Sequence, residues 1–251
     1  MRLPQSGASR VQIEPSNRGN SSLEVLHEHA EASIWSASLY VPIELEDDSG
    51  VAHVLEHMIG TVDTSHGHKF SSLPDVLPGT RICAVTQFDS MCFSVESQSE
   101  SAFLIALQTL YLAAFTSPLP ESLFRQEAFN VVRGVGGNAR FGGTVYNEMR
   151  VDYFDPVRQL DRATRLAAAL DDEFPFDPGG DPAHLRHLTH DAVMTFASRY
   201  LRVSARRCHL DAGLGASLVD QLTGFQRCGN NSSMRLAGCV GKRSSTSLRY
   251  A

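Results

Sequence analysis

The sequence predicts an α+β fold, and two kinds of pattern support this prediction. Short stretches of alternating apolar and polar residues indicate strands, as in residues 32–43, whereas residues 99–114 carry apolar side chains at helical spacing. These segments do not follow the regular strand–helix–strand alternation that is typical of a parallel sheet. With 251 residues, of which 42% are hydrophobic and 20% charged, the chain can bury the core of one large domain or two small ones.

The N-terminal part is expected to contain a disordered segment, a strand, a turn and a helix. Residues 1–22 are polar and rich in serine, asparagine and glycine. Their arginines faintly resemble an organelle transit peptide, but a disordered tail is the favoured interpretation. After the strand at 32–43, the acidic turn at 44–50 offers Asp and Ser side chains that can cap a helix beginning near Val51. Residues 61–78 are polar and contain Gly and Pro, which indicates a loop with at most one short helix.

The remainder of the chain mixes helices with strands. Residues 81–96 predict two strands joined by a turn at 88–90, and residues 204–211 a further strand. Residues 134–143 are rich in glycine and predict a break. Apolar periodicity, proline and capping residues such as Thr189 predict helices at 99–114, 118–132, 156–170, 189–199 and 216–222. Residues 226–251 are basic and aperiodic, so we expect a disordered tail there.

Charge and cysteine content exclude several classes of protein. The net charge of −6 argues against a nucleic-acid partner, which a basic patch would bind. No apolar run approaches the roughly 20 residues that a transmembrane helix needs. The five cysteines are scattered and form no CxxC pair, which favours a reducing compartment, cytoplasmic or organellar such as the mitochondrial matrix. Any metal site must therefore use histidine and carboxylate.

The stretch GVAHVLEHMI carries the strongest chemical signal. His53 and His57 are four residues apart, so a helix would place both on one face, where they can bind one metal ion. Glu56 would lie beside such a metal without needing to bind it, in position to take a proton from a water. H-x-x-E-H is a known metallopeptidase pattern. By itself it leaves a second interpretation open, a solvated helix face that carries two histidines.

A catalytic zinc takes three protein ligands, so a third must come from elsewhere in the chain. Glu148 in GGTVYNEMR is the candidate, because it lies in a short apolar run after the glycine-rich break. The alternative for Glu148 is an ordinary surface carboxylate. Glu127 could lie behind a metal ligand, but a charge on a helix surface is the favoured interpretation.

Several segments resemble a known family when they are taken together. SGVAHVLEHM, FRQEAF, TVYNEM and FPFDPGGDPAHLRHLTHDAVMTFASRYL occur in the order found in the N-terminal catalytic domain of the pitrilysin-type zinc peptidases. Within that family the chain is most similar to the presequence protease and falcilysin branch. The resemblance covers residues 23–225, which would form the metallopeptidase domain between the two disordered ends, 1–22 and 226–251.

The resemblance implies a fold and an activity. The fold would be a mostly antiparallel sheet with helices packed on one face. His53, His57 and Glu148 would bind Zn²⁺, and Glu56 would be the general base. The substrates would be short unstructured peptides, cleaved inside a chamber that a second half-domain or subunit closes.

Three departures from the family pattern matter. The first is a poor match in the region between the motif helix and residue 83, with a shortened segment at 32–42. Where the family has an Asn-Ala-x-Thr strand that binds the substrate backbone, this chain has Cys83, Ala84, Val85 and Thr86, so the expected substrate-binding residues are Cys83, Ala84 and Thr86. The enzymes of this branch are also much longer than this chain. A non-catalytic or truncated zinc-binding domain, serving as a fragment or assembly partner, is therefore the alternative. A scaffold subunit of the same fold is a further rival, although such subunits usually lose the ligands.

Overall fold

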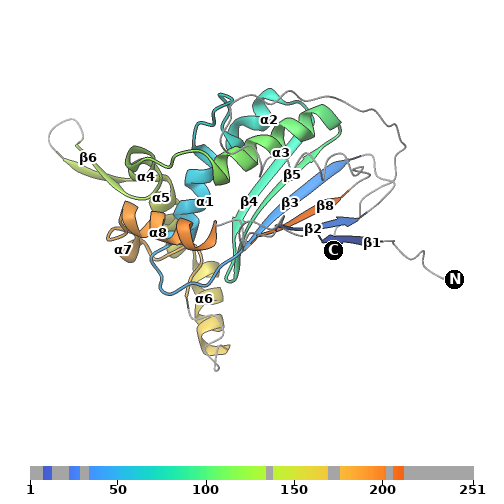
Figure 1. Cartoon of the computed structure of the whole chain (residues 1–251). Helices are drawn as coiled ribbons and strands as arrows, with labels where there is room; N and C mark the ends of the chain where they lie inside the picture. The colour runs from blue at the N-terminus through green and yellow to red at the C-terminus, as the bar shows by residue number, and fades with distance from the viewer. Residues whose placement is uncertain are drawn as a thin grey trace.

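The computed structural model describes residues 8–12, 23–28, 34–133, 138–168, 176–201 and 206–211. A six-stranded sheet runs through the molecule in the order β1-β2-β8-β3-β5-β4 (Figure 1). Neighbouring strands are antiparallel except β2 and β8, which are parallel. The expected, mostly antiparallel sheet is therefore confirmed. The strands are Ala8–Gln12 (β1), Leu23–Glu28 (β2), Trp35–Pro42 (β3), Thr80–Thr86 (β4), Ser90–Ser97 (β5) and Arg206–Asp211 (β8).

The central strands bury one face of the sheet. Successive side chains of a strand point to opposite faces, and in β3 every second residue from Ala37 to Val41 is buried. In β5, Phe93 lies opposite Leu39 of β3 and Ala84 of β4, which continues the same apolar row. The other face is more exposed, as Tyr40 illustrates. This alternation requires helices on one side of the sheet.

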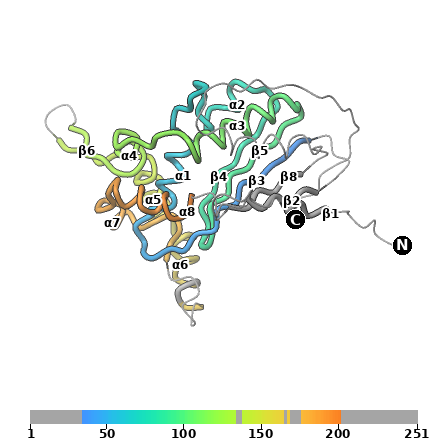
Figure 2. Tube along the Cα trace, in the orientation of Figure 1, coloured from blue at the N-terminus to red at the C-terminus, as the bar shows by residue number. Residues whose placement is uncertain are grey.

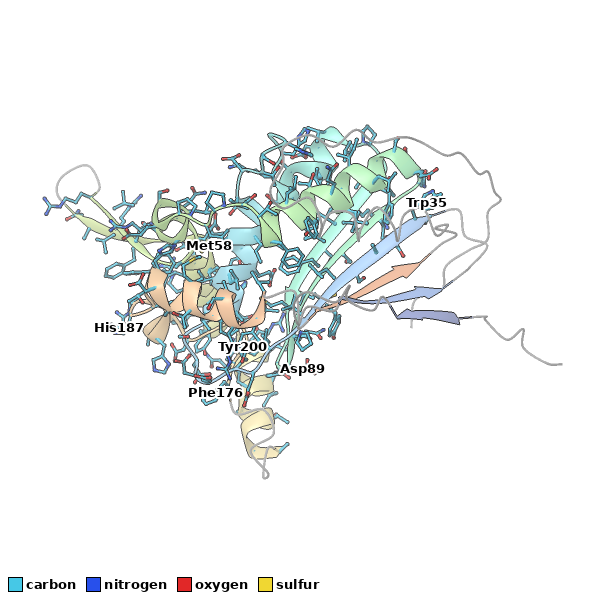
Figure 3. All side chains as sticks on the ribbon, viewed as in Figure 1. Trp35, Met58, Asp89, Phe176, His187 and Tyr200 are labelled. Carbon is cyan, nitrogen blue, oxygen red and sulfur yellow. The ribbon has the colours of Figure 1, made fainter. Side chains whose placement is uncertain are left out.

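Helices cover the apolar face of β3, β5 and β4 (Figure 2). The long helix α3 (Glu100–Phe115) buries Phe103 and Leu110 against it, and α1 (Val51–Thr61) packs on β4 through a largely buried surface that includes Met58, labelled in Figure 3. The 3-10 turn η1 (Phe70–Ser72) and the short helix α2 (Leu73–Val76) close the end of this layer. The fold class predicted from the sequence is confirmed.

A second group of elements surrounds α1 at one end of the sheet (Figure 1). Helices α4, α5 and α8 each contact α1, and α6 projects away from the body. A separate hairpin, β6–β7, extends from the same end. The elements are Glu121–Glu127 (α4), Asn130–Arg133 (β6), Ala139–Gly142 (β7), Thr144–Phe154 (α5), Pro156–Ala168 (α6), Pro182–Leu185 (α7) and His190–Tyr200 (α8).

The structure confirms most of the predicted elements and corrects two of them. The β4–β5 hairpin, α3, α6, the Thr189-capped helix α8 and β8 lie where the sequence predicts them. The helix predicted at 118–132 is wrong in its second half, because α4 ends at Glu127 and the β-branched Val131 and Val132 enter strand β6. The expected glycine-rich break also contributes strand β7, which pairs with β6.

The disorder expected at residues 1–22 stays a prediction. Within residues 1–22 the structure places β1, Ala8–Gln12, which pairs with β2. The rest of that segment, the helix predicted at 216–222 and the tail at 226–251 lie outside the described residues, and the domain boundaries at 22 and 225 remain predictions. Among the helices that the structure describes, none is both long and apolar enough to cross a membrane.

The acidic turn does not cap α1 as the sequence predicts. The N-cap is Gly50, with φ 71° and no side-chain hydrogen bond to the helix. Asp47 instead accepts from the Ser49 amide at 2.9 Å, and Asp48 accepts from the Asp177 amide at 2.6 Å. The turn therefore ties the start of α1 to a distant loop, residues 176–181, and this contact helps to position the site described next.

Candidate metal centre

Helix α1 presents His53, Glu56 and His57 toward one region at the edge of the sheet. The histidines are four residues apart, and their ring centroids lie 4.8 Å apart. Their side chains are 16% and 19% exposed, and Glu56 is buried. The apolar residues between them face the core, so the helix is held by its packing while the histidines stay accessible to a small ion.

Glu148 approaches both histidines from helix α5. Its Oε2 lies 3.3 Å from His57 Nε2 and 3.7 Å from His53 Nε2, and ligand atoms of the three residues lie within 4.8 Å of one another. Zinc bonds of about 2.1 Å in a tetrahedral site place neighbouring ligand atoms roughly 3.4 Å apart. The donor set and its spacing therefore fit zinc. The structure brings together the three residues that the resemblance nominated as ligands.

The other ring nitrogens fix how the histidines present themselves. His53 Nδ1 lies 3.1 Å from the Gly179 carbonyl oxygen, and His57 Nδ1 lies 3.4 Å from Glu127 Oε2. Both partners are acceptors, so in the neutral ring each Nδ1 carries the proton that it donates, and each Nε2 then keeps a free lone pair. Both lone pairs face Glu148, which is the tautomer that a metal ligand requires.

Glu127 is the site residue that the sequence interpretation assigned wrongly. It is not a surface charge: its side chain is buried, and its Oε1 accepts from the Thr61 hydroxyl at 3.1 Å while Oε2 faces His57. A signal was present in the sequence, because Glu127 lies three residues after the buried Phe124 and hence on the same face of α4. A charged residue in an inward-facing position needs a partner, and here His57 provides it.

The paired charges shift the pKa values of both groups. Burial acts to lower the pKa of His57, but the hydrogen bond to Glu127 and the charges of Glu148 and Glu56 outweigh it and raise that pKa. Burial acts to raise the pKa of Glu127, but hydrogen bonds from His57, Thr144 and Thr61 outweigh it and lower that pKa. In the metal-free site His57 therefore loses its second proton at a higher pH than a free imidazole, and Glu127 stays ionised to a lower pH than a free carboxylate.

Glu56 is connected to the edge of the sheet. The Thr86 hydroxyl donates to Glu56 Oε2 at 2.6 Å. Thr86 ends β4, the last strand in the sheet order, so one backbone edge of this strand has no neighbouring strand among the described residues. Ala84 packs against the core, and Cys83, which points to the opposite face, is exposed. Of the three expected substrate-binding residues, Thr86 is the one with a hydrogen bond to Glu56.

A groove adjoins this edge. Its volume is about 610 Å³, and it lies between the β4–β5 turn, helices α5 and α6, and the loop at 176–181. Its lining includes Thr86, Asp89, Met149 and Gly179, so it reaches the neighbours of both Glu56 and the candidate metal ligands. Asp89 and Phe176 mark this end of the sheet in Figure 3. An extended chain could enter the site through this groove.

Several curated proteins share part of this sequence, although no family model matches it. Protein HypA of Clostridium perfringens is 28% identical over 165 residues, covering 63% of this chain and 17% of that protein. Presequence protease 1, chloroplastic/mitochondrial, of Arabidopsis thaliana is 27% identical over 169 residues, covering 64% of this chain and 16% of that protein. The chain thus spans about a sixth of the length of these curated relatives.

Solved structures share the fold over nearly the whole chain. A protein described as an M16-like peptidase from Alicyclobacillus acidocaldarius matches with TM-score 0.66 at 17% identity, covering 94% of this chain and 52% of its own. A protease from Helicobacter pylori matches with TM-score 0.70 at 15% identity, covering 93% of this chain and 53% of its own. An inactive domain of an M16 peptidase from Pseudomonas fluorescens matches with TM-score 0.63 at 14% identity, covering 92% of this chain and 53% of its own. The chain therefore has the fold of the M16-like peptidases.

Proposed function

We propose that this chain is the zinc-binding catalytic domain of a pitrilysin-type metalloendopeptidase, of the presequence protease branch, acting on short unstructured peptides. The observation that carries the proposal is the convergence of His53, His57 and Glu148, with each histidine Nδ1 already engaged by an acceptor. A chance grouping of surface side chains would not require this tautomer at both rings. The sequence similarity to a presequence protease supports the branch.

The residues around the ligands supply the rest of the chemistry. Bound zinc would polarise a peptide carbonyl and lower the pKa of water. Glu56 is the proposed general base: Thr86 holds its Oε2, which leaves Oε1 to take a proton from the attacking water and pass it to the leaving amine. Because Glu56 is buried beside the site and bonded to the sheet, little reorganisation is needed before proton transfer.

The edge of β4 that has no neighbouring strand in the described part of the chain provides a place for the peptide. An extended substrate could add to this strand through backbone hydrogen bonds, which read no side chain and require an unfolded segment. Ala84 and Thr86 would lie along the bound peptide, with Cys83 where the family has asparagine. We infer that folded proteins are excluded, because their strands are already paired.

A zinc-binding domain without turnover is the competing function. Its support is the similarity to an inactive peptidase domain, together with the length of the relatives, of which this chain spans only a part. The two proposals share the metal site and differ in activity. Under either one, a second half-domain or subunit would close the chamber, and a reducing cytoplasmic or organellar compartment agrees with the exposed thiol of Cys83.

Metal analysis tests the shared part of the proposal. Purified protein should contain about one zinc per chain, which His53→Ala and Glu148→Gln should each remove. Glu121→Gln, at an exposed position of α4, is the control and should leave the zinc content unchanged. Zinc that is absent from the wild type, or that survives both ligand substitutions, would show that the site assignment is wrong.

Activity separates the two functions. The wild type should cleave a quenched unstructured peptide, and Glu56→Gln should lower kcat at least about 100-fold while leaving the zinc content intact. Equal rates in the two proteins would exclude Glu56 as the base. If zinc is bound but neither protein cleaves the peptide, the non-catalytic function is correct.

A further inference from the structure

The loop at 176–181 orients one metal ligand from far away in the sequence. Its Gly179 carbonyl accepts from His53 Nδ1 at 3.1 Å. The carboxylate of Asp177 accepts from the Gly179 amide at 2.9 Å, and its backbone carbonyl accepts from the Gly180 amide at 3.0 Å. The direction of the Gly179 carbonyl, and with it the orientation of the His53 ring, therefore depends on how Asp177 is held.

One guanidinium holds Asp177 and also the helix that carries Glu148. Arg162 Nε donates to Asp177 Oδ2 at 2.5 Å, and Arg162 Nη2 donates to Asp152 Oδ2. Asp152 lies one helical turn after Glu148 on α5. The guanidinium also lies 3.7 Å from the centroid of the Tyr153 ring, which restricts its orientation further. Arg162 thus joins the loop behind His53 to the helix behind Glu148.

The three charged side chains that meet at Arg162 are largely buried, so each one depends on the others for charge compensation. The side chains of Arg162, Asp177 and Asp152 are 16%, 14% and 28% exposed, so each charge needs its partner. The remainder of α6 is largely exposed, as Val157 and Leu160 illustrate, and adds little to the core. Asp48 fixes the backbone of Asp177 and Asp181 at the two ends of the loop, but it does not touch the Asp177 carboxylate that caps Gly179.

We propose that Arg162 is a positioning residue for the metal centre. By holding Asp177 and Asp152 together, it fixes the positions of His53 and Glu148 relative to each other. This inference rests on the proposed zinc site, but it concerns residues outside the candidate metal ligands, which also line the groove beside them. It predicts that metal affinity depends on a side chain of the projecting helix α6. Groups that orient metal ligands typically change affinity about 10- to 100-fold when they are removed.

The chain offers a matched control for this proposal. Arg158 lies one turn before Arg162 on α6 and contacts the same carboxylate, with its Nε 3.1 Å from Asp152 Oδ1. It is 64% exposed, and no contact with Asp177 is found among the described residues. Arg162→Gln and Arg158→Gln remove the same charge from the same helix, and only the first releases the loop.

The test is zinc affinity of the full chain, measured by competition with a chromophoric chelator, together with the visible absorption spectrum of the Co²⁺-loaded protein. Arg162→Gln should weaken zinc binding at least tenfold and alter the Co²⁺ spectrum, whereas Arg158→Gln should stay within twofold of the wild type. Arg162→Lys keeps the positive charge but lacks the guanidinium that donates to both carboxylates. Its zinc affinity should fall between those of Arg162→Gln and Arg158→Gln. Asp177→Asn, which keeps an acceptor for Gly179, should match Arg162→Gln, and the double variant should lose no more than either single one.

The possible results separate this proposal from the site itself. If the wild type binds no zinc, the metal site fails and the positioning role fails with it. If the wild type binds zinc and Arg162→Gln binds it equally well, or if Arg158→Gln loses as much, only the positioning role is wrong. Should Arg162→Gln fail to fold, Asp177→Asn and Arg162→Lys decide the question, and wild-type affinity in both would overturn the proposal.

Discussion

At the scale of single residues, the site depends on polar contacts that orient each proposed ligand in the metal-free protein. His57 is held between Glu148 at Nε2 and Glu127 at Nδ1, and His53 between Glu148 and the Gly179 carbonyl. The carboxylate behind His57 has an electrostatic consequence as well as a geometric one. By raising the pKa of His57 in the metal-free protein, it makes zinc compete with a proton.

Zinc affinity should therefore depend on pH through His57. Because its pKa is raised above 6.5, the imidazole is protonated at pH values below that raised pKa, and affinity should fall as pH decreases through it. Glu127→Gln removes the group that contributes most to the rise, so the same fall should occur at lower pH. At pH values where both proteins carry neutral His57, Glu127→Gln should still bind zinc about tenfold more weakly, because the amide orients the ring less well.

Chelator competition across a pH series measures both effects. Glu121→Gln on the exposed face of α4 should follow the wild-type curve at every pH. Identical pH curves for Glu127→Gln and the wild type would contradict the assigned role of Glu127.

At the scale of elements, the start of α1 is a close contact between two loops. Gly50 has φ 71°, and a Cβ there would lie 3.0 Å from the Gly179 carbonyl oxygen and 3.2 Å from Gly180 Cα. Gly180 has φ 88°, and a Cβ there would lie only 2.4 Å from Gly50 Cα. The two glycines allow the loop at 176–181 to lie directly against the N-terminus of the metal-binding helix, which brings Gly179 within reach of His53.

Gly50→Ala should destabilise the protein through this contact. We expect the free energy of unfolding to fall by about 3 kcal/mol, the upper end of the cost of a strained residue, because the left-handed backbone and the crowding act together. Gly67→Ala is the control: its φ is 76° but a Cβ there meets nothing within 4 Å, so only about 1 kcal/mol should be lost. Urea unfolding of the metal-free proteins measures the difference. Equal losses of unfolding free energy in the two variants would show that the contact between Gly50 and the loop adds nothing to the cost.

At the scale of the whole molecule, the metal centre connects parts that are distant in the sequence. Helix α1 carries two of the proposed ligands in the layer that covers the sheet, whereas α5 carries the third in the group of helices at its end. The edge strand β4 contacts Glu56 from a third direction. Binding a metal should therefore stabilise the native state as a whole, because the unfolded chain does not bring these ligands together.

Zinc removal should lower the melting temperature. At free zinc 100 times the Kd, binding adds about 2.7 kcal/mol of stability, which corresponds to roughly 5–10 °C for a chain of this size. A chelator should reverse that gain in the wild type, and His53→Ala should show the same Tm with and without zinc. A wild-type Tm that does not respond to zinc in differential scanning fluorimetry would contradict metal binding at this site.

Local patterns in the sequence were sufficient for much of the fold and for part of the site. The spacing of His53 and His57 places both on one face of a helix, whatever that helix packs against. The alternation in β4 and β5 and the apolar periodicity of α3 likewise predict their elements, because each depends on neighbours within a few residues. The helix predicted at 118–132 failed at Glu127, where the pairing of β6 with β7 overrode helix propensity.

By itself, then, the sequence determined which residues could bind a metal, and only the tertiary structure decided what orients them. The contact of His53 with Gly179 joins residues 126 positions apart, and that of His57 with Glu127 joins residues 70 apart. The spacing of Glu127 from Phe124 can indicate an inward-facing position, but it does not identify His57 as the partner, because that depends on where α4 and the loop at 176–181 pack against α1. That is why Glu127 resembled a surface charge and Arg162 an ordinary residue of an exposed helix, until the fold brought both to the metal centre.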